Sequence, residues 1–325
     1  MEKSGKPLSL ITSENSRLPH SEAPAMLGYG LGLRSPHYEY LLSHLSTGRL
    51  PTADWFEVIT ENYLAAGGRS RAILRKVREH YPVVLHGLSF NIGTDEPADF
   101  NYLDQLKALI LEIEPAWVSD HICWTGLHGR TSHDLLPIAY NQQTLASCVA
   151  KVNQIQDYLQ QQVVLENPST YLQFRASDMP EAEFINGLVS ETGCAILLDI
   201  NNIYVSSFNL GFDPRQYIDS LQPSSIRQFH LAGHTNNGSH IIDTHDHPVC
   251  DEVWELYRYA CQRFGPVATL LERDDHIPEF PELLVELRIA RTVQESVLKE
   301  LALKESSVNG SEWHRSAAGS LDQHK

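Results

Sequence analysis

The stretch HIIDTHDHPV places five side chains that could bind a metal ion within eight consecutive positions: His240, Asp243, His245, Asp246 and His247. In an extended segment, residues two apart project to the same side, so Asp243 and His245 could bind one ion together. We expect Asp246 and His247 to support these ligands or to lie at the rim of the site, and His240 to face solvent. A solvated polar loop is the plain alternative, and the rest of the chain has to decide between the two.

Side chains of the same kinds stand at the ends of six short apolar runs elsewhere in the chain. They are His86, His121, Glu166, Asp199, His230 and Glu272, and Asn202 follows Asp199 by three positions. Taken singly, each has a plain interpretation, such as a structural histidine or an aspartate that caps a helix. Taken together, buried carboxylates would repel one another unless cations lie among them. Imidazole and carboxylate without thiolate indicate zinc, manganese or non-haem iron, so the pattern predicts a metal site.

The apolar runs that carry these residues are typical of strands buried on both faces of a parallel sheet. Eight such runs occur, at residues 25–33, 55–60, 81–88, 116–122, 162–167, 194–200, 226–232 and 266–272. Amphipathic segments separate many of them, with apolar residues at helical spacing in residues 102–113 and 141–161. Strand alternating with helix eight times predicts an α/β fold, a (β/α)₈ TIM barrel. The carboxyl ends of all the strands would meet at one rim, and the predicted metal site would lie there.

Length and composition fit one such domain between two tails. The chain has 325 residues, and its two ends are rich in polar residues without a regular period. We therefore expect a flexible tail at residues 1–24, the barrel domain at residues 25–302, and a second flexible tail at residues 303–325.

The overall charge argues against a nucleic-acid partner. The formal net charge is −16, whereas affinity for a phosphate backbone comes mainly from Lys and Arg. No apolar run approaches the ~20 residues that span a membrane, so we expect no membrane partner. The five cysteines form no CxxC pair, and the N-terminus lacks the apolar core of a signal peptide. These features predict reduced thiols in a cytoplasmic protein.

Several local motifs resemble those of the DUF692 (UPF0276) family of multinuclear non-haem iron-dependent oxidative enzymes. The motifs are ITENY, LHGLSFNIG, SDHICW, LENPSTY, LLDINNIYVSSFNLGFDP, FHLAGH, DTHDHPV and LLERDDHIPEF. The resemblance covers most of the chain, from the first predicted strand to beyond the last one. The family lies within the superfamily of endonuclease IV and xylose-isomerase-like TIM barrels, whose trinuclear metal site has a similar order of ligands.

The resemblance implies an oxidoreductase that holds two or three irons in mixed Fe²⁺ and Fe³⁺ states and uses O₂ as co-substrate, with Zn or Mn as alternative metals. It would modify cysteine residues of a ribosomally synthesised precursor peptide (a RiPP precursor). A small partner protein would present this peptide, and closely similar members are linked to copper handling.

The resemblance also implies which residues bind the ions: His86, His121, Glu166, Asp199, Asn202, His230, Asp243, His245 and Glu272. Glu166 would bridge two ions. The first would be completed by His86 and His121, the second by Asp199, His230 and Glu272, and the third would be held by Asn202, Asp243 and His245. Asn202 stands where the endonuclease pattern has a histidine, and this weaker, harder donor is compatible with iron and an exchangeable coordination position.

We expect three of these ligands to act directly in catalysis, namely Glu166, Asp199 and His230. The peptide would enter at the open rim of the barrel. From their positions in the chain, five residues are candidates for contacting it: Arg34, Asn62, Tyr63, Asn91 and Asn167.

Three other functions share the predicted fold. A zinc-dependent phosphodiesterase like endonuclease IV is disfavoured by the net charge and by Asn202. A sugar isomerase that uses a divalent metal would need a Lys or His at the sugar, and the sequence identifies none. A non-catalytic metal carrier is a poor match, because a rigid site with mixed ligands deep in a barrel is an unsuitable store.

Overall fold

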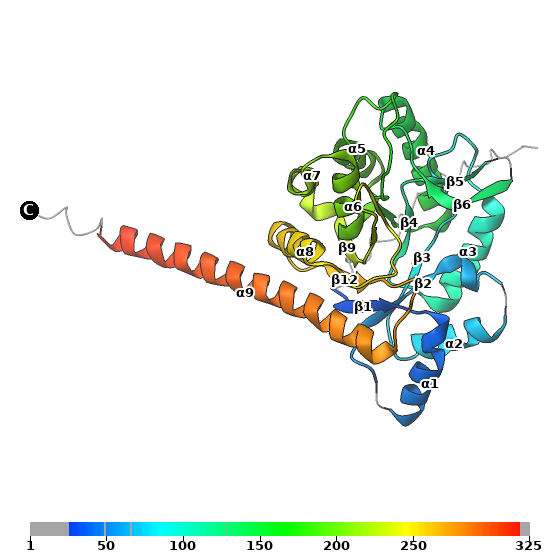
Figure 1. The fold of residues 1–325 in the computed structure, drawn as a ribbon, viewed down its shortest axis with the longest axis horizontal. Helices are drawn as coiled ribbons and strands as arrows, with labels where there is room; N and C mark the ends of the chain where they lie inside the picture. The colour runs from blue at the N-terminus through cyan, green and yellow to red at the C-terminus, as the bar shows by residue number, and fades with distance from the viewer. Residues whose placement is uncertain (1–25, 49, 66, 128, 319–325) are drawn as a thin grey trace, which may run out of the picture.

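Among the residues that the structure describes, eight parallel strands close into a barrel in the computed structural model of the protein (Figure 1). The described residues are 26–318 apart from 49, 66 and 128, with side chains up to residue 304 except that of residue 133. The order around the barrel is β1-β12-β9-β8-β7-β4-β3-β2. The strands are β1 (Tyr29–Gly32), β2 (Trp55–Ile59), β3 (Val83–His86), β4 (Val118–His121), β7 (Val163–Glu166), β8 (Ala195–Asp199), β9 (Ile226–Leu231) and β12 (Ala268–Leu271).

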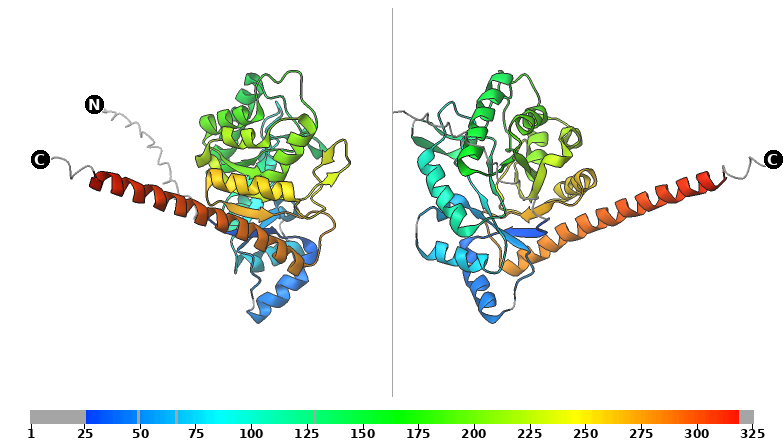
Figure 2. Two further views of the ribbon diagram at one scale, coloured as in Figure 1. Left: turned by 60° about the vertical axis from the view of Figure 1, so that its left-hand side comes forward. Right: turned by 180° about the vertical axis from the view of Figure 1, so that it is seen from behind.

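Each of the eight predicted runs contains one of these strands, so the predicted TIM barrel is confirmed. Helices lie outside the barrel, between successive strands (Figure 2). They are α1 (Tyr38–Thr47), α2 (Arg69–Arg78), α3 (Phe100–Ile113), α4 (Gln142–Leu159), α5 (Glu181–Thr192), α6 (Ile200–Leu210), α7 (Pro214–Ser220), α8 (Asp251–Phe264) and α9 (Phe280–Ala318). The segments predicted to be helical, 102–113 and 141–161, correspond to α3 and α4. Short 3₁₀ turns occur at Ser35–His37, Thr60–Tyr63 and Pro223–Ser225.

Alternation along the strands sorts side chains between two apolar clusters. On β8, Ala195 and Leu197 belong to the cluster inside the barrel, whereas Ile196 and Leu198 join the larger cluster beneath the helices. Because side chains two apart on a strand share a face, the position after each inner apolar residue also points inward. Four candidate ligands stand at such positions, in the pairs Val84 and His86, Val164 and Glu166, Leu197 and Asp199, and Leu270 and Glu272. The apolar cluster therefore forms the floor under the polar rim.

Two antiparallel hairpins follow barrel strands, and the sequence analysis did not anticipate them. One joins β5 (Trp124–Leu127) to β6 (Arg130–Leu136) after β4, and the other joins β10 (Thr235–Asn236) to β11 (Ile241–Ile242) after β9. The second strand of the second hairpin, β11, lies within the metal-capable stretch that begins at His240. It therefore carries that stretch back toward the carboxyl-end rim.

The long C-terminal helix α9 crosses one predicted boundary. We expected the barrel domain to end at residue 302, but α9 runs without a break from Phe280 to Ala318, so this boundary falls inside a helix. Its packing against β1, β12 and α8 joins it to the barrel. The predicted tail at residues 1–24 lies outside the described residues, as do residues 319–325, and flexibility of the C-terminal segment stays a prediction.

Ion pairs between two arginines and a glutamate connect α2 to α3 on the outside of the barrel. The buried Arg71 guanidinium donates to the backbone carbonyls of Tyr63, Leu64 and Ala65 and lies 2.6 Å from Glu112 Oε2. Arg75 Nε lies 2.5 Å from the other carboxylate oxygen of Glu112. The hydrogen bonds from Arg71 and Arg75 lower the pKa of Glu112 to about 2. Glu112 is thus the counter-charge of a buried arginine.

Replacing the Glu112 carboxylate tests how much these ion pairs stabilise the fold. Glu112→Gln should lower the free energy of unfolding by about 1–3 kcal/mol near neutral pH, because it removes charged hydrogen bonds and leaves Arg71 without its anion. The folded-state pKa lies below the ordinary value of 4.5, so this contribution is present above about pH 4.5 and is lost as the pH falls toward about 2. Urea unfolding of both proteins across this range measures the difference. A difference that stayed constant down to pH 2 would contradict the assignment.

Candidate metal centre

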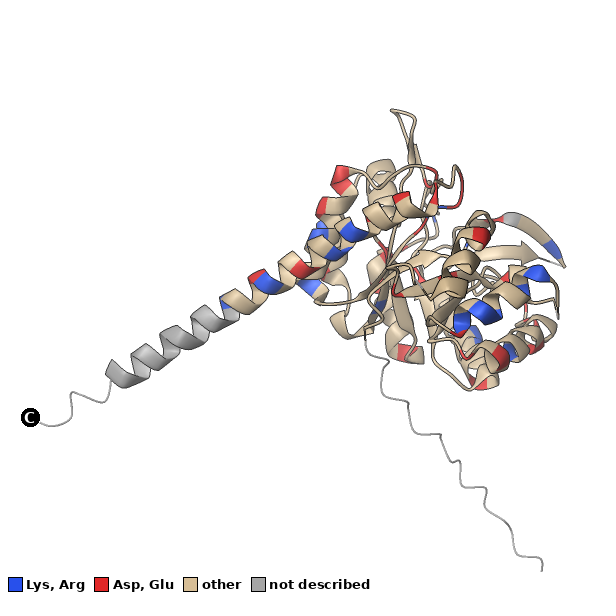
Figure 3. Cartoon of the chain, turned by 90° about the horizontal axis from the view of Figure 1, so that it is seen from below, with Lys and Arg blue, Asp and Glu red and all other residues tan. Residues whose placement is uncertain are grey.

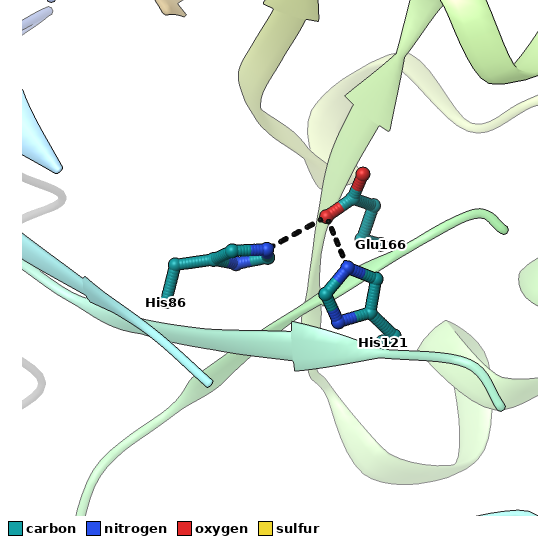
Figure 4. A group of neighbouring side chains, drawn as sticks. All are labelled: His86, His121 and Glu166. Carbon is teal, nitrogen blue, oxygen red and sulfur yellow. Dashed lines mark ion pairs between the residues drawn. The ribbon is translucent and has the colours of Figure 1, made fainter. Parts of the chain in front are cut away.

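Three neighbouring strands bring two histidines and a glutamate together at the rim. His86 ends β3, His121 ends β4 and Glu166 ends β7, and all three side chains are buried. Figure 4 shows both imidazole rings directed at the carboxylate of Glu166. The Nε2 atoms of His86 and His121 lie 3.1 and 3.2 Å from the same oxygen, Glu166 Oε2. This group has the ligand types and closeness that a divalent ion needs.

The far edges of these two rings show which nitrogen is free for an ion. His121 Nδ1 lies 3.1 Å from the carbonyl oxygen of Gly87, which only accepts, so this nitrogen carries the proton. His86 Nδ1 lies 2.8 Å from the Ser119 hydroxyl, which itself donates to a backbone carbonyl. In neutral rings both Nε2 lone pairs then face a carboxylate oxygen. That arrangement is repulsive unless a cation or an additional proton lies between them.

Electrostatic interactions among these side chains agree with this view. Burial by itself would lower the pKa of His121, but the Glu166 carboxylate outweighs burial and raises it to about 9. Burial alone would raise the pKa of Glu166, yet His121 and His230 hold it well below its ordinary value. Without a metal ion, protons on His121 and His230 would supply positive charge beside Glu166.

Asp199 serves two purposes with its two oxygens. It is the N-cap of α6, where Oδ1 accepts the backbone N–H of Asn202 at 2.6 Å. Its Oδ2 has no hydrogen-bond partner among the described residues and lies 3.9 Å from His230 Nδ1. Burial, together with the carboxylates of Glu166 and Asp243, raises the pKa of Asp199 to about 8. The helix-cap and ligand interpretations of this aspartate are therefore compatible.

His230, at the centre of the site, faces three carboxylates with one nitrogen. Its Nδ1 lies 3.2 Å from Glu272 Oε2 and 3.6 Å from Glu166 Oε1. Glu272 in turn contacts Arg34, whose Nη2 lies 3.1 Å away. Burial would raise the pKa of Glu272, but the nearby His245, His230 and Arg34 hold it well below its ordinary value.

The loop after β11 brings Asp243 and His245 to the same rim, but by a different geometry from the one expected. We predicted an extended segment, whereas β11 ends at Ile242 and His245 adopts a left-handed conformation with φ of 51°. Two backbone hydrogen bonds hold this turn, from His245 N–H to Gly233 and from Asp274 N–H to His245. The side chains still meet, with His245 Nε2 2.7 Å from Asp243 Oδ1. His245 Nδ1 lies 3.2 Å from Asp274 Oδ2 on its other edge.

The other members of this stretch have different environments. His240 is exposed beside the hydroxyl of Ser239. Asp246 accepts from His247 Nδ1 at 2.6 Å and from the hydroxyls of Thr244 and Thr235. These contacts make Asp246 the anchor of the turn.

Two adjacent asparagines at the start of α6 face the site. The amide nitrogen of Asn202 donates to the backbone carbonyl of Asn167 at 3.1 Å, and its Oδ1 has no hydrogen-bond partner within the described residues. Asn201, which the sequence analysis missed, donates to Asp243 Oδ1 at 2.8 Å and contacts His234. Its only sequence signal is its place between two predicted ligands.

The five residues proposed to contact substrate have different environments. Asn62 is exposed, whereas Tyr63 is buried with its hydroxyl 2.7 Å from that of Tyr38. Asn91 supports the start of the β5–β6 hairpin through Thr125 and Gly126. Both ends of the Asn167 amide bond the backbone of Asp199. Arg34 pairs with Glu272 and Asp274. Contact of any of the five with a substrate stays a prediction.

Glu57 on β2 is the other residue that the sequence analysis missed. It is buried, with Oε1 3.1 Å from His230 Nε2. Its signal in the sequence was a single carboxylate inside the apolar run WFEVIT, two positions after Trp55 of the inner cluster.

Unsatisfied polar atoms provide a test of whether cations fit this site. Six buried nitrogen and oxygen atoms at the rim have no hydrogen-bond partner among the residues that the structure describes. They are Glu57 Oε1, Glu166 Oε2, Asp199 Oδ2, Asn202 Oδ1, His230 Nδ1 and His245 Nε2. Buried polar atoms rarely stay unpaired, and these are all metal-ligand types without sulfur. The residues present therefore fit bound metal ions.

The donors form overlapping groups, which indicates more than one ion. Within the described residues, four groups have mutually close ligand atoms: His86, His121 and Glu166; Glu166, Asp199 and His230; Asp199, His245 and Glu272; and Glu57, His230 and Glu272. Glu166, Asp199, His230 and Glu272 each belong to two groups. Shared carboxylates are the usual bridges of multinuclear sites, so the rim could hold a multinuclear metal centre.

Fold and site together define a TIM barrel with a candidate multinuclear metal centre at the carboxyl ends of its strands. A model of the family described as "RiPP precursor modification enzyme MbnB/TglH/ChrH" matches residues 28–295. The chain belongs to this family of enzymes that modify RiPP precursors, which confirms the resemblance seen in the sequence motifs.

Curated relatives are similar over most of their length. A UPF0276 protein of Caulobacter vibrioides is 47% identical over 264 residues, which cover 81% of this chain and 93% of the relative. A UPF0276 protein of Anaeromyxobacter sp. is 46% identical over 276 residues, covering 85% and 96%.

Solved structures share the fold at low sequence identity. Endonuclease IV from Thermus thermophilus aligns with a TM-score of 0.53 at 16% identity, covering 83% of this chain and 99% of that one. D-psicose 3-epimerase from Clostridium cellulolyticum aligns with a TM-score of 0.55 at 11% identity, with the same coverage. These similarities establish the barrel architecture only.

Over the described part of the chain, no helix is both long and apolar enough to cross a membrane.

The bridging role of Glu166 can be tested by charge removal. Glu166→Gln should lose most of its bound metal while keeping its fold, because a neutral amide no longer offsets the charge of two neighbouring cations. Metal per chain by elemental analysis and circular dichroism measure the two effects. The matched control is Glu181→Gln. Glu181 is a half-buried glutamate on α5 whose carboxylate accepts a hydrogen bond from Tyr217. Unchanged metal content in Glu166→Gln would remove this residue from the centre.

The loop offers a graded series of variants. Asp243→Ala and His245→Ala should each deplete one metal position, whereas the exposed His240→Ala should bind metal like the wild type. Asp246→Ala and His247→Ala should be intermediate, since losing a residue that orients a ligand typically weakens metal binding by roughly 10–100-fold. Metal content and competition with a chelator rank the five variants. Equal damage from His240→Ala and His245→Ala would show that the ligands of this loop are wrongly chosen.

Proposed function

We propose that this protein is an iron-dependent, O₂-using oxidase that modifies cysteine residues of a ribosomally synthesised precursor peptide in the cytoplasm. One observation supports it most: donor groups without thiolate share three buried carboxylates, Glu166, Asp199 and Glu272, in a member of a precursor-modifying family. Imidazole, carboxylate and amide oxygen suit iron, and overlapping groups suit two or three ions. The five cysteines are unpaired, in agreement with a reducing compartment.

Two or three irons of mixed Fe²⁺ and Fe³⁺ state, when bound, would supply a site for the substrate thiolate and the means to reduce O₂. Glu166 would hold two ions close together by its two oxygens. His86, His121 and His245 would present one nitrogen each, since their other nitrogens contact Ser119, Gly87 and Asp274. We propose that Glu166, Asp199 and His230 carry the direct catalytic roles, because they form one donor group in which every member also belongs to a second group.

Residues around the rim would orient the peptide. Arg34 pairs with Glu272 and with the half-exposed Asp274, so it would hold the outer wall of the centre in place. The loop after β7 exposes Tyr171, Leu172 and Phe174, and the Tyr171 hydroxyl accepts the backbone N–H of Asp243. An apolar loop that contacts the metal-site loop directly would suit a peptide side chain next to the reacting cysteine.

Charge supports a peptide rather than a nucleic-acid substrate. In the view of Figure 3, lysine and arginine positions are interspersed with acidic ones along the helices. With a net charge of −16, the protein is poorly suited to a polyanion. A small protein that presents the precursor peptide is part of the proposal.

The decisive experiment combines metal analysis with oxygen uptake. Protein purified without chelator from iron-replete, low-oxygen culture should hold about two to three irons per chain, given the number of overlapping donor groups. It should consume O₂ when given a cysteine-containing precursor peptide encoded beside its gene, and a Cys→Ser peptide should abolish this uptake. Stoichiometric zinc, with cleavage of abasic DNA or epimerisation of a ketose as the only activity, would overturn the proposal.

A further inference from the structure

We propose that Glu57 is a positioning residue for His230, and that a chain of hydrogen bonds starting at Trp117 decides which nitrogen of His230 faces the metal. The inference rests on the proposed metal centre, because His230 must bind an ion. It concerns three residues outside the predicted ligand set: Trp117, Gln228 and Glu57.

The chain of hydrogen bonds crosses the interior of the barrel. Trp117 Nε1 donates to Gln228 Oε1 at 2.7 Å, and Gln228 Nε2 donates to Glu57 Oε2 at 2.7 Å. The last hydrogen bond of the chain joins Glu57 Oε2 to His230 Nε2 at 3.3 Å, and Glu57 Oε1 lies 3.1 Å from the same nitrogen. All four side chains are buried, with exposed fractions of 6, 0, 1 and 0% in this order. No water is needed to complete the connection from the indole to the imidazole.

The direction of the chain follows from its first member. An indole N–H can only donate, so Gln228 must turn its carbonyl oxygen toward Trp117. The amide NH₂ of Gln228 then faces Glu57, which therefore accepts. The edge of His230 that meets the Glu57 carboxylate has to donate, which places the ring proton on Nε2. In a neutral ring Nδ1 keeps its lone pair, and Nδ1 is the nitrogen that faces Glu166 and Glu272.

His230 differs in this respect from its neighbours on β3 and β4. His86 and His121 present Nε2 to the centre, and their outer partners are a hydroxyl and a backbone carbonyl. The outer partner of His230 is a carboxylate, which makes an imidazole a stronger ligand than a neutral acceptor does. Glu57 contacts the Nε2 edge of the ring and Glu272 the Nδ1 edge, so we place Glu57 on the side of His230 away from an ion bound at Nδ1. Glu57 thus acts through His230.

Two tryptophans of the inner cluster allow a matched test. Trp55 and Trp117 are both buried, with ring centroids 5.9 Å apart. The indole nitrogen of Trp55 has no hydrogen-bond partner among the described residues, whereas that of Trp117 begins the chain. Trp55→Phe and Trp117→Phe remove similar apolar surface, but only Trp117→Phe frees Gln228 to turn over. We expect Trp117→Phe and Glu57→Gln to weaken metal retention by roughly 10–100-fold and Trp55→Phe to leave it near the wild-type level.

A double variant tests the direction of the chain. In Glu57→Gln, the introduced amide would accept from Gln228 with its oxygen and turn its NH₂ toward His230, forcing the ring proton onto Nδ1. Adding Trp117→Phe lets the amide of Gln228 turn over, so that the introduced amide can accept from His230 again. The double variant should therefore retain metal better than Glu57→Gln alone. If these residues had a purely structural role, the losses of metal retention in Glu57→Gln and Trp117→Phe would add in the double variant.

The measurement is metal per chain in the metal-loaded protein as purified, across graded concentrations of chelator, with thermal unfolding as the check on folding. Equal retention in Glu57→Gln, Trp117→Phe and Trp55→Phe, or additive losses in the double variant, would overturn the inference while the metal centre stands. Outright loss of one ion in Glu57→Gln with full retention in Trp117→Phe would make Glu57 a ligand and overturn it too. A wild-type protein without metal would instead mean that the proposed function fails.

Discussion

The rest of the structure depends on three carboxylates that are buried within reach of the same histidines. At the mouth of the barrel, solvent reaches almost none of the surface of Glu166, Asp199 and Glu272. Burying such charges is unfavourable unless opposite charge is close by. Their pKa values diverge in the cation-free protein, because histidines hold Glu166 and Glu272 ionised while Asp199 is raised to about 8. The site is built for positive charge that the protein chain alone does not fully supply.

The barrel makes this concentration of charge possible. Inward-facing positions alternate along each strand, so an apolar residue one layer down is followed by a polar residue at the rim. The inner apolar cluster keeps water out from below and raises the strength of every interaction above it. Between the floor and the rim, hydrogen bonds join Trp117 to Gln228 and Gln228 to Glu57 in a buried polar layer. The centre is therefore held from beneath as well as from the surrounding loops.

Orientation of the histidines is as much a part of the site as their identity. Each candidate histidine ligand has a partner on the edge away from the centre, namely Ser119, Gly87, Glu57 or Asp274. These partners fix the ring planes and leave one nitrogen of each ring for an ion. Asp199 is fixed in a similar way, since capping α6 with one oxygen holds the other toward the centre. The side chain of Asp199 therefore caps helix α6 and offers a candidate metal ligand at the same time.

The sequence by itself determined the barrel and the residue types at its rim, because both follow from local patterns. Apolar runs with β-branched residues correspond to the strands, and polar residues at their ends correspond to the rim, as His86, Glu166 and Glu272 illustrate. The local motifs also identified the family, which the comparisons confirm. The sequence analysis named no helix at the C-terminal end, where α9 runs from Phe280 to Ala318 across the predicted boundary at residue 302.

Only the tertiary structure decided how these residues work together. The contact between Glu57 and His230 joins positions 173 apart in the chain, and no local pattern encodes it. The left-handed turn at His245 depends on backbone hydrogen bonds to Gly233 and Asp274. The proposed choice of nitrogen on His230 depends on the indole of Trp117, which immediately precedes β4. Periodicity reports which face of a strand a side chain occupies, whereas partners across a closed barrel are set by the packing of all eight strands at once.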